Sequence, residues 1–241
     1  MLWRTLGLAA ALMLAGCAGQ SAGPFDGIEG GRLGDLDLSA KPTGLILLGP
    51  DEVRLRLGEA LTISIDGDST VTDALRFAIH EGKLAVLRQP GFGARGKAVV
   101  NVTMPAPESL VTAGSGRISA ESLAPKADVT IAGSGGIETL SVAAETLKVT
   151  IAGSGTYRAA GTAGALDMTI AGSGDADMEA LKADSASIRV VGSGRSGFAS
   201  DGVVRAAIAG SGEVRVRGHA RCEAKATGSG RLVCEPEVPA S

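Results

Sequence analysis

The tripeptide Gly-Ser-Gly occurs seven times in the second half of the chain, at an almost constant spacing. The repeats begin at Gly114, Gly133, Gly153, Gly172, Gly192, Gly210 and Gly228. Successive spacings are 19, 20, 19, 20, 18 and 18 residues. A fixed period of this size indicates repeated structural units, each of which buries its apolar face only by stacking on its neighbours.

The residues that flank each tripeptide alternate between apolar and polar. The position two before each first glycine holds Thr112, Ile131, Ile151, Ile170, Val190, Ile208 and Ala226. The position four before it holds Leu110, Val129, Val149, Met168, Ile188, Ala206 and Ala224, and the position two after each second glycine holds Ile118, Ile137, Tyr157, Ala176, Ser196, Val214 and Leu232. A period of two predicts β-strands with one buried face.

The column five residues before each first glycine is polar, and its charges are ordered. It reads Ser109, Asp128, Lys148, Asp167, Ser187, Arg205 and Glu223. No two successive members carry the same charge, which is what parallel stacking at about 4.8 Å requires of direct neighbours. The sequence therefore predicts an all-β fold, a right-handed parallel β-helix of about seven coils of 18 to 20 residues, with glycines at the corners.

Residues 25–110 are less regular, although alternating segments such as Val53 to Leu57 and Val100 to Met104 still indicate strands. We interpret them as degenerate coils or a cap, because the ends of a solenoid must differ from its middle. We expect one domain over residues 25–235, with regular coils over 111–235 and a tail at 236–241. Pro236 and Pro239 lie in that tail and are expected to discourage a further strand from adding below the last coil.

The first residues read as a bacterial lipoprotein signal. Arg4 precedes a short apolar run from Leu6 to Leu14, which is too short for a membrane-spanning helix. The segment Leu14-Ala15-Gly16-Cys17 is similar to a lipobox, which predicts a signal peptide at 1–16, lipidation of Cys17 and a tether at 17–24. Several acyl chains on one residue anchor a protein stably to a membrane. By similarity, Ala18 after the cysteine favours the outer membrane.

The whole pattern resembles a known family. The repeated Gly-Ser-Gly strands, the opening Phe25-Asp26-Gly27-Ile28 and the segment Glu81-Gly82-Lys83-Leu84 are similar to the head GIN domain family. The resemblance covers residues 25 to 234 and implies a right-handed β-helix described as the head of an autotransporter adhesin. It brings no catalytic or binding residues with it. Since we find no barrel-forming segment, the lipid is expected to provide the anchor.

The serines at the centres of the repeats are candidates for a ridge of hydroxyls that binds a polar polymer. They are Ser115, Ser134, Ser154, Ser173, Ser193, Ser211 and Ser229. The alternative is structural, because serine is small and suits a stacked corner. None is expected to be a nucleophile, because the only histidines, His80 and His219, lie in unrelated segments and are expected at the surface.

Other chemistry is weakly indicated. Gly-Ser-Gly opens no helix here, so a phosphate cradle is not expected. Asp175 and Asp177 resemble one copy of a calcium-binding repeat, but the acidic pattern does not recur. With Glu179 they also form the densest acidic cluster, which a polysaccharide-acting enzyme would use, although the mature chain has only one Tyr to stack on sugars. We expect no enzyme, metal or cofactor.

Cys222 and Cys234 occupy inward-facing positions in the alternating pattern of the last coil. A disulfide between them would close a loop of about a dozen residues and contribute about 3 kcal/mol in an oxidising compartment. The alternative, two reduced and buried cysteines, is equally compatible with the spacing.

These features predict a non-catalytic lipoprotein of the cell envelope whose β-helix surface serves adhesion, or interaction with an envelope protein or glycan. The alternatives are a structural scaffold without a specific ligand and, less favoured, the polysaccharide-acting enzyme. The net charge of −3 gives no basic footprint for nucleic acid.

Overall fold

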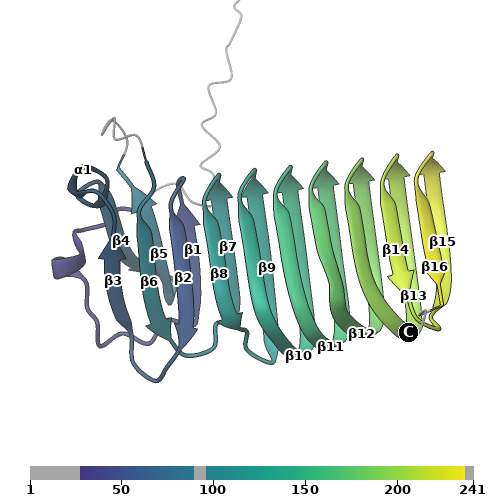
Figure 1. Cartoon of the computed structure of the whole chain (residues 1–241), viewed down its shortest axis with the longest axis horizontal. Helices are drawn as coiled ribbons and strands as arrows, with labels where there is room; N and C mark the ends of the chain where they lie inside the picture. Colours follow the sequence, from purple (N-terminus) through teal and green to yellow (C-terminus); the bar gives the residue numbers. More distant parts are fainter. Residues whose placement is uncertain (1–27, 90–95, 237–241) are drawn as a thin grey trace, which may run out of the picture.

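The structure is a computed structural model that describes residues 28–89 and 96–236. These residues form a right-handed parallel β-solenoid with about seven turns, as the sequence predicts. Figure 1 shows the coils side by side along the long axis of the molecule, with the irregular N-terminal region at one end and the last coil at the other.

The regular coils contain strands β7 to β16. Their bounds are β7 (Ser109–Gly114), β8 (Arg117–Ser122), β9 (Lys126–Gly133), β10 (Gly136–Gly153), β11 (Thr156–Gly172), β12 (Asp175–Gly192), β13 (Arg195–Gly210), β14 (Glu213–Arg217), β15 (Arg221–Gly228) and β16 (Arg231–Glu235). All pair in parallel with the neighbouring coil. Each first glycine pairs with the first glycine of the next coil, so the seven tripeptides lie above one another at one edge.

The glycines are required by the geometry of this corner. Gly153 has a φ of +118°, and a Cβ placed on it would lie 2.5 Å from the carbonyl oxygen of Gly133 in the preceding coil. The second glycine has a different reason. A Cβ on Gly174 would lie 2.5 Å from Cγ2 of the buried Ile151. The first glycine thus permits the turn, and the second permits the close approach of the core.

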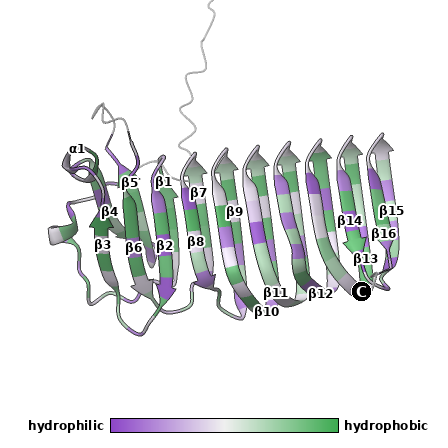
Figure 2. Cartoon of the chain, viewed as in Figure 1, coloured by the Kyte–Doolittle hydropathy of each residue, from purple (hydrophilic) through white to green (hydrophobic). Residues whose placement is uncertain are grey.

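The core is filled by the apolar columns. The burial pattern of β10 alternates strictly except at Leu140–Ser141 and Glu145–Thr146, where two successive residues are exposed and the chain turns. Each long strand is thus divided into three straight segments around one core. Figure 2 shows the resulting alternation of hydrophobic and hydrophilic residues along every coil. Tyr157 lies fully inside, where burial raises its pKa to about 12 and its hydroxyl donates to Oγ1 of Thr139.

The polar column also has the predicted register. Asp128 lies beside Lys148, with Nζ to Oδ1 at 3.7 Å, and Arg205 lies beside Glu223 at 3.1 Å. The ordered charges in the sequence therefore correspond to direct neighbours in the stack.

The N-terminal region begins with the short 3-10 helix η1 (Leu33–Asp35) and departs from a simple coil. Its strands are β1 (Gly44–Leu48), β2 (Glu52–Leu57), β3 (Thr62–Asp66), β4 (Leu75–His80), β5 (Lys83–Arg88) and β6 (Val99–Met104), with helix α1 (Ser69–Thr72) between β3 and β4. β1 and β2 form a parallel coil against β7 and β8, and β5 and β6 form the next one outward. β3 and β4 then pair antiparallel with β6 and β5 and end the stack.

A buried ion pair joins the coil of β1 and β2 to the coil of β5 and β6. Gly49-Pro50-Asp51 occupies the corner that Gly-Ser-Gly occupies elsewhere, since the backbone N–H of Arg117 donates to the carbonyl oxygen of Asp51. The Asp51 carboxylate, 1% exposed, accepts from the guanidinium of Arg88 and, at 2.8 Å, from the backbone N–H of Ala98. One carboxylate therefore connects β1–β2 to β5 and to the start of β6.

Candidate interaction surface

The strands that follow each Gly-Ser-Gly corner carry two outward columns of mostly polar residues. We call this surface the charged face. Its first column is Glu52, Arg117, Gly136, Thr156, Asp175, Arg195, Glu213 and Arg231, and its second is Arg54, Ser119, Glu138, Arg158, Asp177, Gly197, Arg215 and Val233. Alternation along the strand aims these side chains at solvent while their neighbours fill the core.

A groove of about 610 Å³ opens in the charged face over Gly197. Gly197 has no side chain, so it leaves a gap in the second column between Asp177 and Arg215. We call this depression the charged groove. Its charged lining residues are Arg158, Asp175, Asp177, Glu179, Arg195, Glu213, Arg215 and Arg231. Acidic and basic groups are equal in number, so the groove offers both hydrogen-bond acceptors and donors.

Most of these groups form ion pairs with one another. Arg158 lies 3.6 Å from Asp177, and Glu213 accepts from Arg215 at 2.9 Å and from Arg231 at 2.5 Å. Arg217 pairs with Glu179 across the intervening coil. The paired arginines are 46 to 68% exposed, and exposed pairs contribute only about 0 to 1 kcal/mol each. The groups can therefore exchange their partners for those of a ligand at little cost.

The acidic cluster identified in the sequence lies in this groove. Asp175, Asp177 and Glu179 all line it. Asp177 and Glu179 are about half exposed and each is paired with an arginine. A general acid for glycoside hydrolysis needs a carboxyl kept protonated by burial, which is a different environment. The geometry of this cluster is that of a solvated ion-pair network.

The seven candidate serines stand at the corner beside the charged face, and all of them are exposed. The backbone N–H of Ser154 donates to the carbonyl oxygen of Gly133 in the preceding coil, and Ser134, Ser173, Ser193 and Ser211 repeat this bond. These five serine N–H groups are thus satisfied, and the exposed serines follow one line because their flanking glycines stack in register. Whether they bind a polymer stays a prediction.

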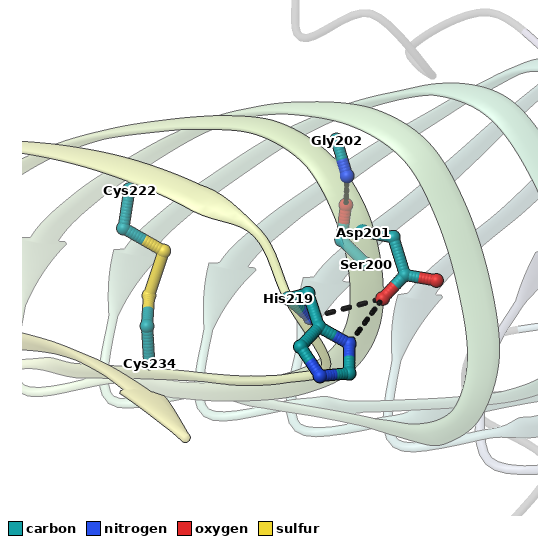
Figure 3. The surroundings of a disulfide bond; sticks show 6 residues. All are labelled: Ser200, Asp201, Gly202, His219, Cys222 and Cys234. Carbon is teal, nitrogen blue, oxygen red and sulfur yellow. Dashed lines mark hydrogen bonds and ion pairs between the residues drawn. A yellow bond between two sulfur atoms is a disulfide. The ribbon is translucent and has the colours of Figure 1, made fainter. Parts of the chain in front are cut away.

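Cys222 and Cys234 form a disulfide across the last coil, with their Cα atoms 6.8 Å apart. Figure 3 shows the bond between β15 and β16, near a corner that contains Ser200, Asp201 and His219. His219 is exposed, and its Nδ1 lies 3.5 Å from Asp201. The hydroxyl of the buried Ser200 accepts from the backbone N–H of Gly202. These residues stabilise a turn, because the serine oxygen faces its own backbone and not the histidine.

Asp201 is the most perturbed carboxyl of this corner. Hydrogen bonding from the Lys182 side chain, and then from the backbone N–H of His219, lowers its pKa to about 2. Lys182 and Asp201 lie 2.5 Å apart. The charge of Asp201 therefore joins the coil of β12 to the segment that leads into β15.

Cys17 and the predicted signal peptide lie outside the described residues, as does Pro239. Within residues 28–89 and 96–236, no helix is long and apolar enough to cross a membrane. In the same ranges, no group of three or more His, Cys, Asp or Glu side chains is arranged to hold a metal ion.

Sequence reasoning named Asp175, Asp177 and Glu179 but missed the groove around them. The available signal was Gly197, a glycine at an outward strand position between the charged residues Asp177 and Arg215 of one column. It also missed the Asp51–Arg88 pair, because the two residues are 37 positions apart and no motif connects them.

Solved structures share this fold. A protein from Bacteroides fragilis titled a "putative adhesin" has a TM-score of 0.70 at 14% identity, over 83% of this chain and 94% of that one. A "putative lipid binding protein" from Parabacteroides distasonis has 0.64 at 20% identity, over the same shares. A "putative adhesin" from Parabacteroides merdae has 0.58 at 19%, over 82% and 92%. No curated protein matches the chain.

The sequence itself matches one family model over most of the solenoid. Residues 41–220 match the family described as "putative auto-transporter adhesin, head GIN domain". This range contains the N-terminal coil, six of the seven Gly-Ser-Gly corners and the charged groove apart from Arg231. The chain therefore belongs to the head GIN domain family.

Proposed function

We propose that the protein is an exported, lipid-anchored protein of the bacterial cell envelope, whose solenoid is a non-catalytic surface for adhesion. The charged groove carries this proposal. It is a depression of about 610 Å³, and its exposed ion pairs can be exchanged for those of a partner. The adhesin descriptions of the family and of its structural neighbours are consistent with such a role.

The chemistry of the groove selects the kind of partner. None of the described residues that line it is aromatic, whereas neutral sugars are usually held against aromatic rings. Guanidinium groups pair with carboxylates or phosphates, and the carboxylates pair with amines. We therefore propose a partner that carries charged groups, either a glycan with acidic or amino substituents or a polar protein segment.

Filling the groove tests this proposal. Gly197→Gln places a side chain on the floor, where the added Cβ would be 3.3 Å from the flexible Glu179 side chain. The matched control is Gly136→Gln on the same face, where the nearest atom would be 3.4 Å away. On an array of charged glycans and envelope proteins, we expect Gly197→Gln to lose most binding and Gly136→Gln to retain it.

Three results would contradict the proposal. Equal binding by the two variants would place the contact elsewhere on the solenoid. A failure of the unmodified chain to bind any glycan or envelope protein would favour the structural scaffold. Release of reducing sugar from a polysaccharide would favour the enzyme instead. Circular dichroism of both variants should match the unmodified chain, which excludes misfolding as the cause of lost binding.

The lipid anchor needs a separate test. Replacement Cys17→Ser removes the sulfur that would carry the diacylglycerol, so we expect the protein to move from the membrane fraction to the soluble periplasmic fraction. Unchanged fractionation would remove the anchor from the proposal, while the groove would remain to be tested.

A second candidate function is the binding of an acyl chain at the N-terminal cap. A pocket of about 300 Å³ there is lined by Leu33, Ile65, Leu75 and Phe77, with Arg32 and Asp73 among its polar residues. One structural neighbour is titled a lipid binding protein. Gly34→Trp would obstruct the pocket, because a Cβ at Gly34 meets nothing within 4 Å. We expect this variant to lose binding of a fluorescent fatty acid, while Gly136→Trp retains it; equal binding would exclude the pocket.

A further inference from the structure

The last coil presents two strand edges that have no neighbour on their outer side. Among the described residues, β15 pairs with β13 and β16 pairs with β14, and no strand follows them in the sheet. Ala224 and Ala226 belong to the inward columns, yet both are exposed because no coil covers them. Such edges are templates for pairing with another strand.

The backbone groups of β16 that face the free edge can be assigned. The N–H of Arg231 donates to Gly212, and the carbonyl oxygen of Glu235 accepts from Gly218, so both residues face the stack. Because backbone groups alternate along a strand, those of Leu232 and Cys234 point to the free edge. Pro236 follows β16 and does not interrupt these positions.

The same assignment holds for β15. The N–H of Asp128 donates to the preceding coil, and Glu223 occupies the same column in β15. The backbone groups of Glu223 and Lys225 therefore face β13, whereas those of Ala224 and its alternate neighbours point to the free edge.

Both edges are complementary to themselves when a second copy approaches antiparallel. If Ala224 lies opposite its own copy, Glu223 faces the partner copy's Lys225, and the reverse pair forms as well. If Val233 of β16 lies opposite its own copy, Arg231 faces the partner copy's Glu235. Each strand thus forms two reciprocal pairs of opposite charge, which favour antiparallel pairing.

The hydrogen-bonding pattern agrees with these registers. Ala224 points to the free edge, so it would form a hydrogen-bonded pair with its copy. Leu232 would do so with the partner copy's Cys234, which leaves Val233 in a closely spaced, non-hydrogen-bonded pair. Ala224 and Val233 lie five and four residues from Ser229 at the corner, so one two-fold axis passes near both.

We propose that two copies of this chain associate end to end through β15 and β16, related by this two-fold axis. The disulfide between Cys222 and Cys234 holds the two edge strands together in the geometry that pairing requires. The opposite end is built differently, because it ends in the antiparallel strands β3 and β4, and Gly31 already pairs with Phe77 on the outer edge of β4. The inference is independent of the ligand of the charged groove.

A symmetric cross-link tests the contact. Val233→Cys would place two thiols across the axis, where paired Cα atoms of a non-hydrogen-bonded pair lie about 4.5 Å apart. The control Arg215→Cys occupies the same column one coil inward. After mild oxidation of the purified full chain, we expect Val233→Cys to give a reducible species of twice the mass on a denaturing gel, linked at position 233 by peptide mapping. Arg215→Cys should stay monomeric, and equal yields from the two variants would overturn the proposal.

Charge reversal provides a second test that needs no new thiol. Lys225→Glu places acidic residues opposite each other, and Glu223→Lys places basic residues opposite each other, so each variant alone should sediment as a monomer at concentrations where the unmodified chain is dimeric. An equimolar mixture restores both opposite-charge pairs and should form the heterodimer. If the mixture stays monomeric while the unmodified chain dimerises, the register is wrong; a monomeric unmodified chain at all concentrations would overturn the proposal.

Discussion

The two ends of the solenoid are built differently. At the N-terminal end, β3 and β4 reverse direction and cover the edges of β6 and β5, and the buried Asp51–Arg88 pair joins the coil of β5 and β6 to the coil of β1 and β2. At the C-terminal end, the strands remain parallel and exposed, and a disulfide joins them. At the first end, Gly31 also pairs with Phe77 on the outer edge of β4, whereas no described residue pairs with the outer edges of β15 and β16. The second end is therefore the one that can accept a partner.

The largest expected effect of a single substitution is at the cap. Asp51→Ala leaves the Arg88 guanidinium, 11% exposed, without its buried carboxylate, which should reduce the free energy of unfolding by about 3 to 5 kcal/mol. Glu223→Ala breaks an exposed pair at the other end and should cost less than about 1 kcal/mol. Urea denaturation of both variants measures the difference. Similar losses would mean that the cap pair does not fix the N-terminal end.

Removing the disulfide should weaken the opposite end. The double variant Cys222→Ser with Cys234→Ser is expected to lose about 3 kcal/mol, because the unfolded chain regains the freedom of the closed loop. Hydrogen exchange should accelerate in β15 and β16 and remain unchanged in β3 and β4. Uniform acceleration over the whole solenoid would show that the disulfide stabilises the stack globally and not its end.

A gain of stability is expected in the coil of β7 and β8. Oγ1 of Thr112 is buried and has no hydrogen-bond partner among the described residues. Ile131, Ile151 and Ile170 stand at the same position in later coils. Thr112→Val keeps the shape and removes an unsatisfied hydroxyl, so thermal unfolding should show a gain of about 1 kcal/mol. A loss would reveal a partner for the hydroxyl.

The smallest expected effect on stability is the protonation of Asp201, near the C-terminal end of the solenoid. The pKa of Asp201 is lowered from 3.8 to about 2 in the folded state, so its stabilising contribution is present above about pH 4 and is lost as the pH falls toward 2. Asp201→Asn should lower the melting temperature slightly at pH 6 and leave it almost unchanged at pH 2. A constant difference across this range would show that the Asp201 charge is not responsible.

The regular coils could be predicted in detail because their signals are local and repeated. The glycine spacing, the inward columns and the order of Asp128, Lys148 and Asp167 all correspond to the observed register. The cap could not be predicted to the same level. The chain forms β1 and β2, crosses to the outermost strands β3 and β4, and then forms β5 and β6 between these two layers. It then passes β1 and β2 to reach β7, an order that alternation alone does not encode.

The last coil also shows a limit of what the alternating pattern can predict about burial. Ala224 and Ala226 follow the inward pattern of the sequence, yet they are exposed because no further coil lies beyond them. A pattern specifies which side of a strand faces inward, whereas burial also requires a neighbour.

The amino-acid sequence by itself determined the parallel solenoid, the position of its corners and the faces of its strands. These features follow from a short repeat, from the backbone sterics of glycine and from the alternation of side chains along a strand. Only the tertiary structure decided how each end is finished, which charges meet across the cap and where the absence of one side chain at Gly197 opens a groove. Those features depend on residues distant in the chain, whose contacts exist only once the coils have stacked.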